Sequence, residues 1–96
     1  MMSKREEYID KMAARLKEVN GEIDKLNAKA KQAQADAKME YEKQVKELES
    51  NADEMKRNIE ELKNAGEQSW EELKTGVEAS WTVLSNSVKN AMERFK

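Results

Sequence analysis

The sequence predicts an all-α protein made of long amphipathic helices that form a coiled coil. Three observations predict this fold: the chain has no proline, its 96 residues include only three glycines, and its apolar residues recur at steps of three and four. Ala, Glu, Lys, Gln and Leu are abundant in the rest of the chain, and these are strong helix formers. Because steps of three and four return to the same side of a helix, the apolar residues form one continuous stripe.

The first two thirds of this stripe follow a heptad pattern. It alternates regularly from Ile9 to Ala37, takes two steps of four to Tyr41 and Val45, and then alternates again to Leu62. Two consecutive steps of four are a stutter, which shifts a coiled coil locally but keeps its apolar face continuous.

The last third of the stripe has an 11-residue repeat, in which Trp70, Trp81 and Met92 occupy equivalent positions. Such a repeat favours straight or slightly right-handed helix packing. The complete stripe is the association surface that we predict, and it consists of Ile9, Met12, Leu16, Val19, Ile23, Leu26, Ala30, Ala33, Ala37, Tyr41, Val45, Leu48, Met55, Ile59, Leu62, Trp70, Leu73, Val77, Trp81, Leu84, Val88, Met92 and Phe95.

The strongest turn chemistry near the midpoint lies at residues 50–53, Ser-Asn-Ala-Asp, because Asn tolerates turn conformations and Ser or Asp can cap the next helix. We therefore expect one domain over residues 1–96, a helical hairpin with helices over about 4–49 and 54–95. This hairpin would set the small residues Ala30, Ala33 and Ala37 opposite a segment that includes Trp70. The alternative is one long helix to about residue 63 followed by a shorter one, with the break at Asn64-Ala65-Gly66.

Two helices alone would leave much of the stripe exposed, and a chain this short builds only a small core. We therefore expect a homo-oligomer, with a dimer favoured that completes an antiparallel four-helix bundle, or else a complex with a protein client. The interpretation that follows is a non-catalytic interaction or structural protein that self-associates. One alternative is a chain that folds on a client protein during stress.

Composition argues against most chemistry. The chain has no histidine and no cysteine, so imidazole bases, thiolate nucleophiles and the commonest metal ligands are missing. We expect no enzyme activity, no catalytic residue, no cofactor, no metal and no small-molecule substrate. The most basic stretch, residues 25–38, also holds Asp36 and has no aromatic residue, so we expect no nucleic-acid partner.

Trp70 and Trp81 admit two interpretations. They are either packing anchors inside a bundle or interfacial anchors that lay the last helix on a lipid surface, which makes peripheral membrane binding an alternative function. Helices that bind anionic lipid carry Lys and Arg on their polar face. Residues 65–88 offer one cation, Lys74, against Glu67, Glu71, Glu72 and Glu78, so packing is favoured.

Four segments together resemble a known family: YIDKMAARLK at residues 8–17, EIDKL at 22–26, YEKQV at 41–45, and WEELKTGVEASW at 70–81. They are similar to small bacterial coiled-coil proteins, found in cyanobacteria and proteobacteria, that are described as stress-response proteins. The paired-Trp segment is the most specific part. The resemblance implies a bacterial stress-response protein and assigns no catalytic or ligand residue. The sequence has neither the apolar run of a secretory signal nor a membrane-spanning stretch, so we expect a cytoplasmic location.

Overall fold

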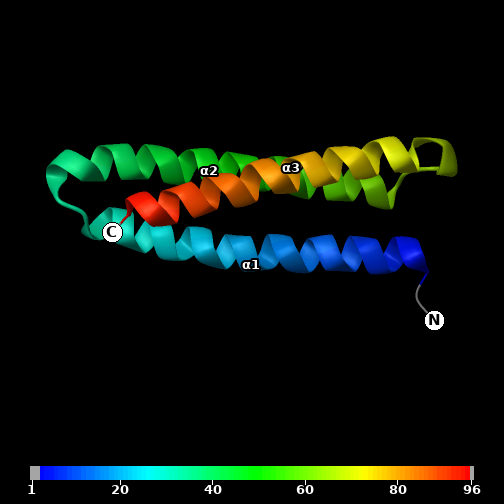
Figure 1. The fold of residues 1–96 in the computed structure, drawn as a ribbon, viewed down its shortest axis with the longest axis horizontal. Helices are drawn as coiled ribbons and strands as arrows, with labels where there is room; N and C mark the ends of the chain where they lie inside the picture. The colour runs from blue at the N-terminus through cyan, green and yellow to red at the C-terminus, as the bar shows by residue number, and fades with distance from the viewer. Residues whose placement is uncertain (1–2, 96) are drawn as a thin grey trace.

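The computed structural model describes residues 3–95 as three long helices packed side by side (Figure 1). Helix α1 spans Lys4–Gln32, α2 spans Ala35–Lys63 and α3 spans Glu67–Arg94. The chain runs up, down and up again, so that α1 and α3 point the same way and α2 runs against both. The body measures 51 × 23 × 17 Å. The prediction of an all-helical protein is confirmed.

The predicted two-helix hairpin is wrong. Residues 50–53 lie in the middle of α2, where Ala52 is buried in the core. A turn at this point would interrupt the stripe between Leu48 and Met55. Keeping Asn51 and Asp53 in a helix costs each at most about 0.7 kcal/mol relative to Ala, whereas burying a large apolar side chain contributes about 1.5–3 kcal/mol. Burial therefore decides against the local turn chemistry.

The first break falls between α1 and α2 at Ala33 and Gln34, where nothing in the sequence marks the end of a helix. Both residues are extended, with φ/ψ of −69°/154° and −66°/155°. The Ala33 N–H donates to the Ala30 carbonyl, and no side chain caps the start of α2. In this folded chain the break also excludes the alternative of one unbroken helix from the N-terminus to about residue 63.

The second break falls where that alternative expected a helix to end. Helix α2 ends at Lys63, and the Asn64 side-chain amide donates to the Glu60 carbonyl at 3.1 Å, which satisfies one of the free carbonyls of the last turn. Gly66 then occupies the N-cap position of α3 in an extended conformation. Asn and Gly are the residue types that end helices most readily.

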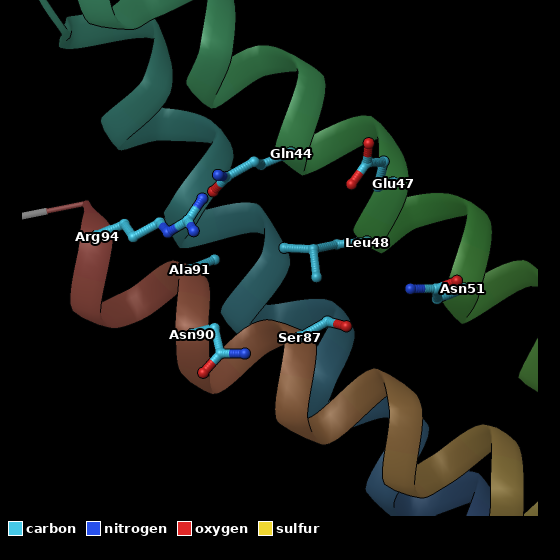
Figure 2. A pocket seen from close by; sticks show the side chains of 8 residues that line it. All are labelled: Gln44, Glu47, Leu48, Asn51, Ser87, Asn90, Ala91 and Arg94. Carbon is cyan, nitrogen blue, oxygen red and sulfur yellow. The ribbon is translucent and has the colours of Figure 1, made fainter.

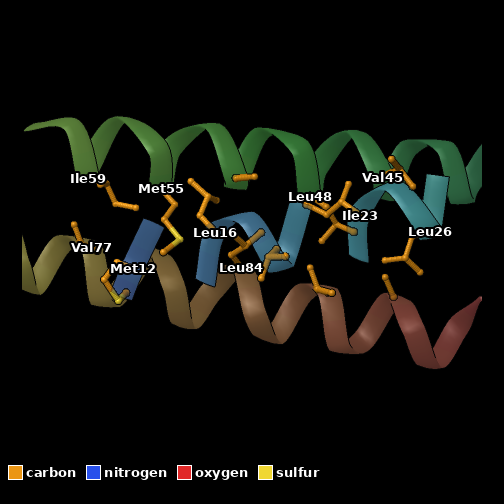
Figure 3. Close-up of a cluster of buried hydrophobic side chains, with 14 of the residues drawn as sticks. Met12, Leu16, Ile23, Leu26, Val45, Leu48, Met55, Ile59, Val77 and Leu84 are labelled. Atoms are coloured by element: carbon orange, nitrogen blue, oxygen red, sulfur yellow. The ribbon is translucent and has the colours of Figure 1, made fainter. Parts of the chain in front are cut away.

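All three helices turn their apolar residues toward a common axis, where they form one core (Figure 3). Met12, Leu26, Met55, Leu62, Leu84, Val45 and Val77 are its largest fully buried side chains. Among residues 3–95 no helix is both long and apolar enough to cross a lipid bilayer.

Candidate association surface

The structure buries most of the predicted association residues inside a single chain. The buried ones are Met12, Leu16, Val19, Ile23, Leu26, Ala30, Val45, Leu48, Met55, Ile59, Leu62, Trp70, Val77, Leu84, Val88 and Phe95. The half-buried ones are Ile9, Ala33, Ala37, Tyr41, Leu73 and Trp81. Because three helices share the stripe, the folded chain covers most of it without a partner, and a second molecule that docks on this closed chain meets other residues.

Helix α3 packs on a heptad spacing and not on the predicted 11-residue repeat. Trp70, Val77, Leu84 and Ala91 are buried and follow one another at intervals of seven, whereas Met92 is 47% exposed. A seven-residue spacing keeps one face toward neighbouring helices that wind gently in a left-handed sense. The equivalence of Trp70, Trp81 and Met92 in the sequence therefore does not extend to their positions in the fold.

Aromatic and cationic side chains join α1 to α3 at the N-terminal end of both helices. Tyr8 and Trp70 meet edge to face, with ring centroids 5.7 Å apart and an angle of 67° between the planes. The Arg5 guanidinium lies 5.1 Å from the centre of the Trp70 ring, and the Lys74 ammonium lies 4.9 Å from that of Tyr8. Each cation of this kind adds about 0.5–1 kcal/mol at an exposed site.

The second tryptophan, Trp81 on α3, also contacts a cationic side chain of α1. The Arg15 guanidinium lies 5.4 Å from the centre of the half-buried Trp81 ring. Trp70 itself is only 6% exposed. Both indoles thus contact α1 side chains, a placement that favours packing over anchoring in lipid.

The Tyr8 hydroxyl donates a hydrogen bond of 3.2 Å to the Glu78 carboxylate on α3. The partial burial of the phenol, followed by the charge and the hydrogen bond of Glu78, raises the pKa of Tyr8 from 10.0 to about 12. The phenol is therefore neutral at physiological pH and serves as a donor between two helices. Sequence reasoning missed this pair, because nothing local links residue 8 to residue 78.

An aromatic contact also closes the opposite end of the bundle. Tyr41 near the start of α2 stacks on Phe95, with ring centroids 4.1 Å apart, and its hydroxyl donates to the Arg94 carbonyl at 3.0 Å. This contact secures the last turn of α3.

A shallow polar hollow of about 190 Å³ lies between α2 and α3 near that end (Figure 2). Its side chains are Gln44, Glu47, Leu48, Asn51, Ser87, Asn90, Ala91 and Arg94. Within the described residues, the buried Gln44 side-chain oxygen lacks a hydrogen-bond partner. The polar lining of the hollow consists mainly of amide and hydroxyl groups, with one carboxylate from Glu47 and one guanidinium from Arg94, so the arrangement offers hydrogen bonds.

One exposed part of α3 is set apart by its lack of charge. Residues 79–88 form the longest run without a charged residue in a chain that is 40% charged. Five residues recur at steps of three and four in this run or just outside it, and all five are exposed: Gly76, Ala79, Val83, Asn86 and Asn90. We call these five residues the α3 outer face.

Two threonine hydroxyls beside the α3 outer face donate hydrogen bonds within the helix. The Thr75 and Thr82 hydroxyls donate to the Glu71 and Glu78 carbonyls, each at 3.0 Å. Burying these two hydroxyls under a partner would therefore leave neither O–H donor unpaired. The Val83 side chain next to Thr82 is 55% exposed.

Gly76 has no role in the fold of one chain. A Cβ atom added there would meet nothing within 4 Å, and its φ is not positive. Glycine inside a helix costs about 1 kcal/mol relative to alanine. Close approach of another helix is a physical reason for glycine at such a position.

Metal binding finds no support in the part of the chain that the structure describes: no group of three or more Asp or Glu side chains could hold a metal ion. No protein-family model, curated protein or solved structure matches the chain.

Proposed function

We propose that this chain is a non-catalytic structural or interaction protein that self-associates through the α3 outer face. The observation that carries the proposal is the absence of charge from residues 79–88, on a helix whose inner side is already packed. The central part of a protein–protein interface is depleted in charged residues relative to the remaining surface.

A second copy is the partner that the charges favour. Antiparallel pairing of two α3 helices about Val83 would set Gly76 opposite Asn90 and bring Ala79 close to Asn86. The acidic start of α3, at residues 67–72, would then approach the end that carries Lys89 and Arg94. Opposite charges at the rim fix the orientation of such a pair more than they raise its affinity.

This interface would be small. The α3 outer face extends over about 21 Å, at 1.5 Å per residue from Gly76 to Asn90. Contacts that bury less than about 1,200 Å² in total belong to weak or transient complexes. We therefore expect a dimer that dissociates on dilution in the micromolar range or above.

A bacterial stress response is the physiological setting that the resemblance of the paired-Trp segment suggests, and the cytoplasm is the matching location. Both belong to the proposal. In that setting a weak dimer responds to concentration, because association follows mass action and increases as the protein accumulates.

Sedimentation velocity over a range of concentrations tests the proposal with Val83→Glu and the matched control Met39→Glu. Met39 is 80% exposed on α2 and lies outside the α3 outer face, so both variants exchange an exposed apolar side chain for a carboxylate. In protein that has not been refolded from denaturant, the wild-type chain and Met39→Glu should dimerise reversibly. Val83→Glu should stay monomeric there, because the two-fold symmetry of the pair would place each new carboxylate beside the one from the other copy. A wild-type chain that is monomeric throughout, or equal effects of both substitutions, would contradict the proposal.

A further inference from the structure

The connection between α1 and α2 contains no residue that opposes a helix. Ala33 and Gln34 both favour helical conformation, and neither glycine nor proline occurs anywhere from residue 22 to residue 65. The α2–α3 connection differs, since it contains Asn64 with its side-chain hydrogen bond and Gly66. Tertiary packing, not local sequence, therefore imposes the first bend.

The apolar stripe stays in phase across this bend. Ala30, Ala33, Ala37, Tyr41 and Val45 follow one another at steps of three or four, as they would on one unbroken helix. Two separate helices joined by a two-residue connection do not need this regular spacing across the join. The extended residues alone decide which side of the second helix faces the first. A continuous helix does require it if one partner is to cover the whole stripe.

We propose that the Ala33–Gln34 connection is a hinge that straightens into helix and lets two copies of the chain exchange α1. Straightening turns residues 4–63 into one helix of about 90 Å, at 1.5 Å per residue. That helix can no longer cover its own stripe. The α1 segment of a second, antiparallel copy takes the vacated place on α2 and α3, and the exchange is reciprocal.

The exchange preserves the contacts of the closed chain. Tyr8 again meets Trp70 and donates to Glu78, but the two helices now belong to different copies. This equivalence is why swapped dimers form at low energetic cost, and short hinge loops favour them. Near the centre of the dimer the two long helices would cross at residues 30–37, where the small side chains of the stripe residues Ala30, Ala33 and Ala37 permit a close approach.

This swapped dimer does not depend on the α3 outer face. It uses the α1 surface that is buried in the closed chain, and it leaves Val83 exposed. Its exchange is slow because α1 must leave the core, whereas the proposed α3 pair dissociates freely on dilution. Each form of association can therefore fail without the other.

Gln34→Pro is the variant that separates the closed chain from the swapped dimer. In the closed chain Gln34 has φ of −66°, Ala33 before it is extended, and the Gln34 N–H donates no backbone hydrogen bond within the described residues. Proline is compatible with the closed chain, because it has this φ, lacks the N–H and prefers an extended residue before it. It cannot occupy the interior of a continuous helix without breaking that helix. Gln34→Ala is the matched control, because alanine permits both states.

The experiment refolds each variant from denaturant at high concentration, isolates any dimer by size exclusion, and measures its maximum dimension by small-angle X-ray scattering. For the wild-type chain and Gln34→Ala we expect a slowly exchanging dimer that is clearly longer than the 51 Å of the closed chain. Gln34→Pro should give closed chains and no long dimer, and Val83→Glu should still give the long dimer. The absence of a long wild-type dimer, its formation by Gln34→Pro, or its loss in Val83→Glu would overturn the proposal.

Discussion

Tyr8 and Trp70 hold α1 against α3, their rings meeting edge to face with centroids 5.7 Å apart. These two helices run parallel and are joined only through α2, so their contact has to form between segments far apart in the chain. The Tyr8 hydroxyl extends the contact to Glu78, about two turns of α3 beyond Trp70. The contact therefore forms only when α1 and α3 have packed against each other.

Replacing Trp70 with alanine should destabilise the folded chain strongly. Trp70 is 6% exposed, and emptying a large buried aromatic site costs about 3–5 kcal/mol of unfolding free energy. Trp81→Ala is the matched comparison, and it should cost less because the Trp81 ring is only half-buried. Urea unfolding followed by circular dichroism measures both. Equal losses, or a larger loss for Trp81→Ala, would show that the assigned packing of α3 is wrong.

The elevated pKa of Tyr8 predicts a loss of stability in strong alkali. Because partial burial and Glu78 raise the folded-state pKa from 10.0 to about 12, the folded chain favours the neutral phenol. This contribution is fully present below about pH 10 and is lost as the pH rises toward about 12. In Tyr41→Phe, Tyr8 is the only tyrosine, and ultraviolet absorbance should follow its ionisation with a midpoint near 12.

Glu78→Gln, added to Tyr41→Phe, is the control for that titration. It removes the negative charge beside the phenol and should lower the midpoint, although partial burial keeps it above the ordinary value. An ordinary midpoint in a Tyr41→Phe chain that circular dichroism shows to be helical would contradict the contact between Tyr8 and Glu78.

Proline substitutions should separate the real first bend from the turn that residues 50–53 suggested. Gln34→Pro should leave the unfolding free energy unchanged or raise it by about 0.4–1 kcal/mol, because proline fits the closed conformation and restricts the unfolded chain. Asn51→Pro should cost about 3 kcal/mol or more, because Asn51 lies inside α2. Thermal unfolding of both variants checks this. If Gln34→Pro were less stable than Asn51→Pro, the turn would lie at residues 50–53, as the hairpin prediction has it.

The periodicity of apolar residues predicted which side chains are buried in the core. The steps of three and four identified the residues that now form the core from Met12 to Leu62, and Asn64 with Gly66 marked the end of α2. The first bend could not be predicted in this way. Ala33 and Gln34 are helix formers, and the bend exists only because the two stripes it brings together can then bury each other.

The candidate surface was predictable only in part. The sequence singled out Trp70 and Trp81, but their partners Tyr8 and Arg15 come from a helix whose position depends on the unpredicted bend. The periodicity of large apolar residues does not reveal the α3 outer face, because Val83 is its only large apolar member. Its signal is the missing charge of residues 79–88, which hydrophobic periodicity does not register.

The odd number of helices also determines how the folded chain would resist mechanical force. The start of α1 and the end of α3 lie at opposite ends of the long axis (Figure 1). Tension applied between them would act along the helices and load their interfaces in shear, so that many core contacts would have to slip together. A two-helix hairpin has both ends on the same side and would open one layer at a time under the same pull. Resistance to stretching is thus built into the up-down-up path of the chain, and the rate of unfolding under load would measure it.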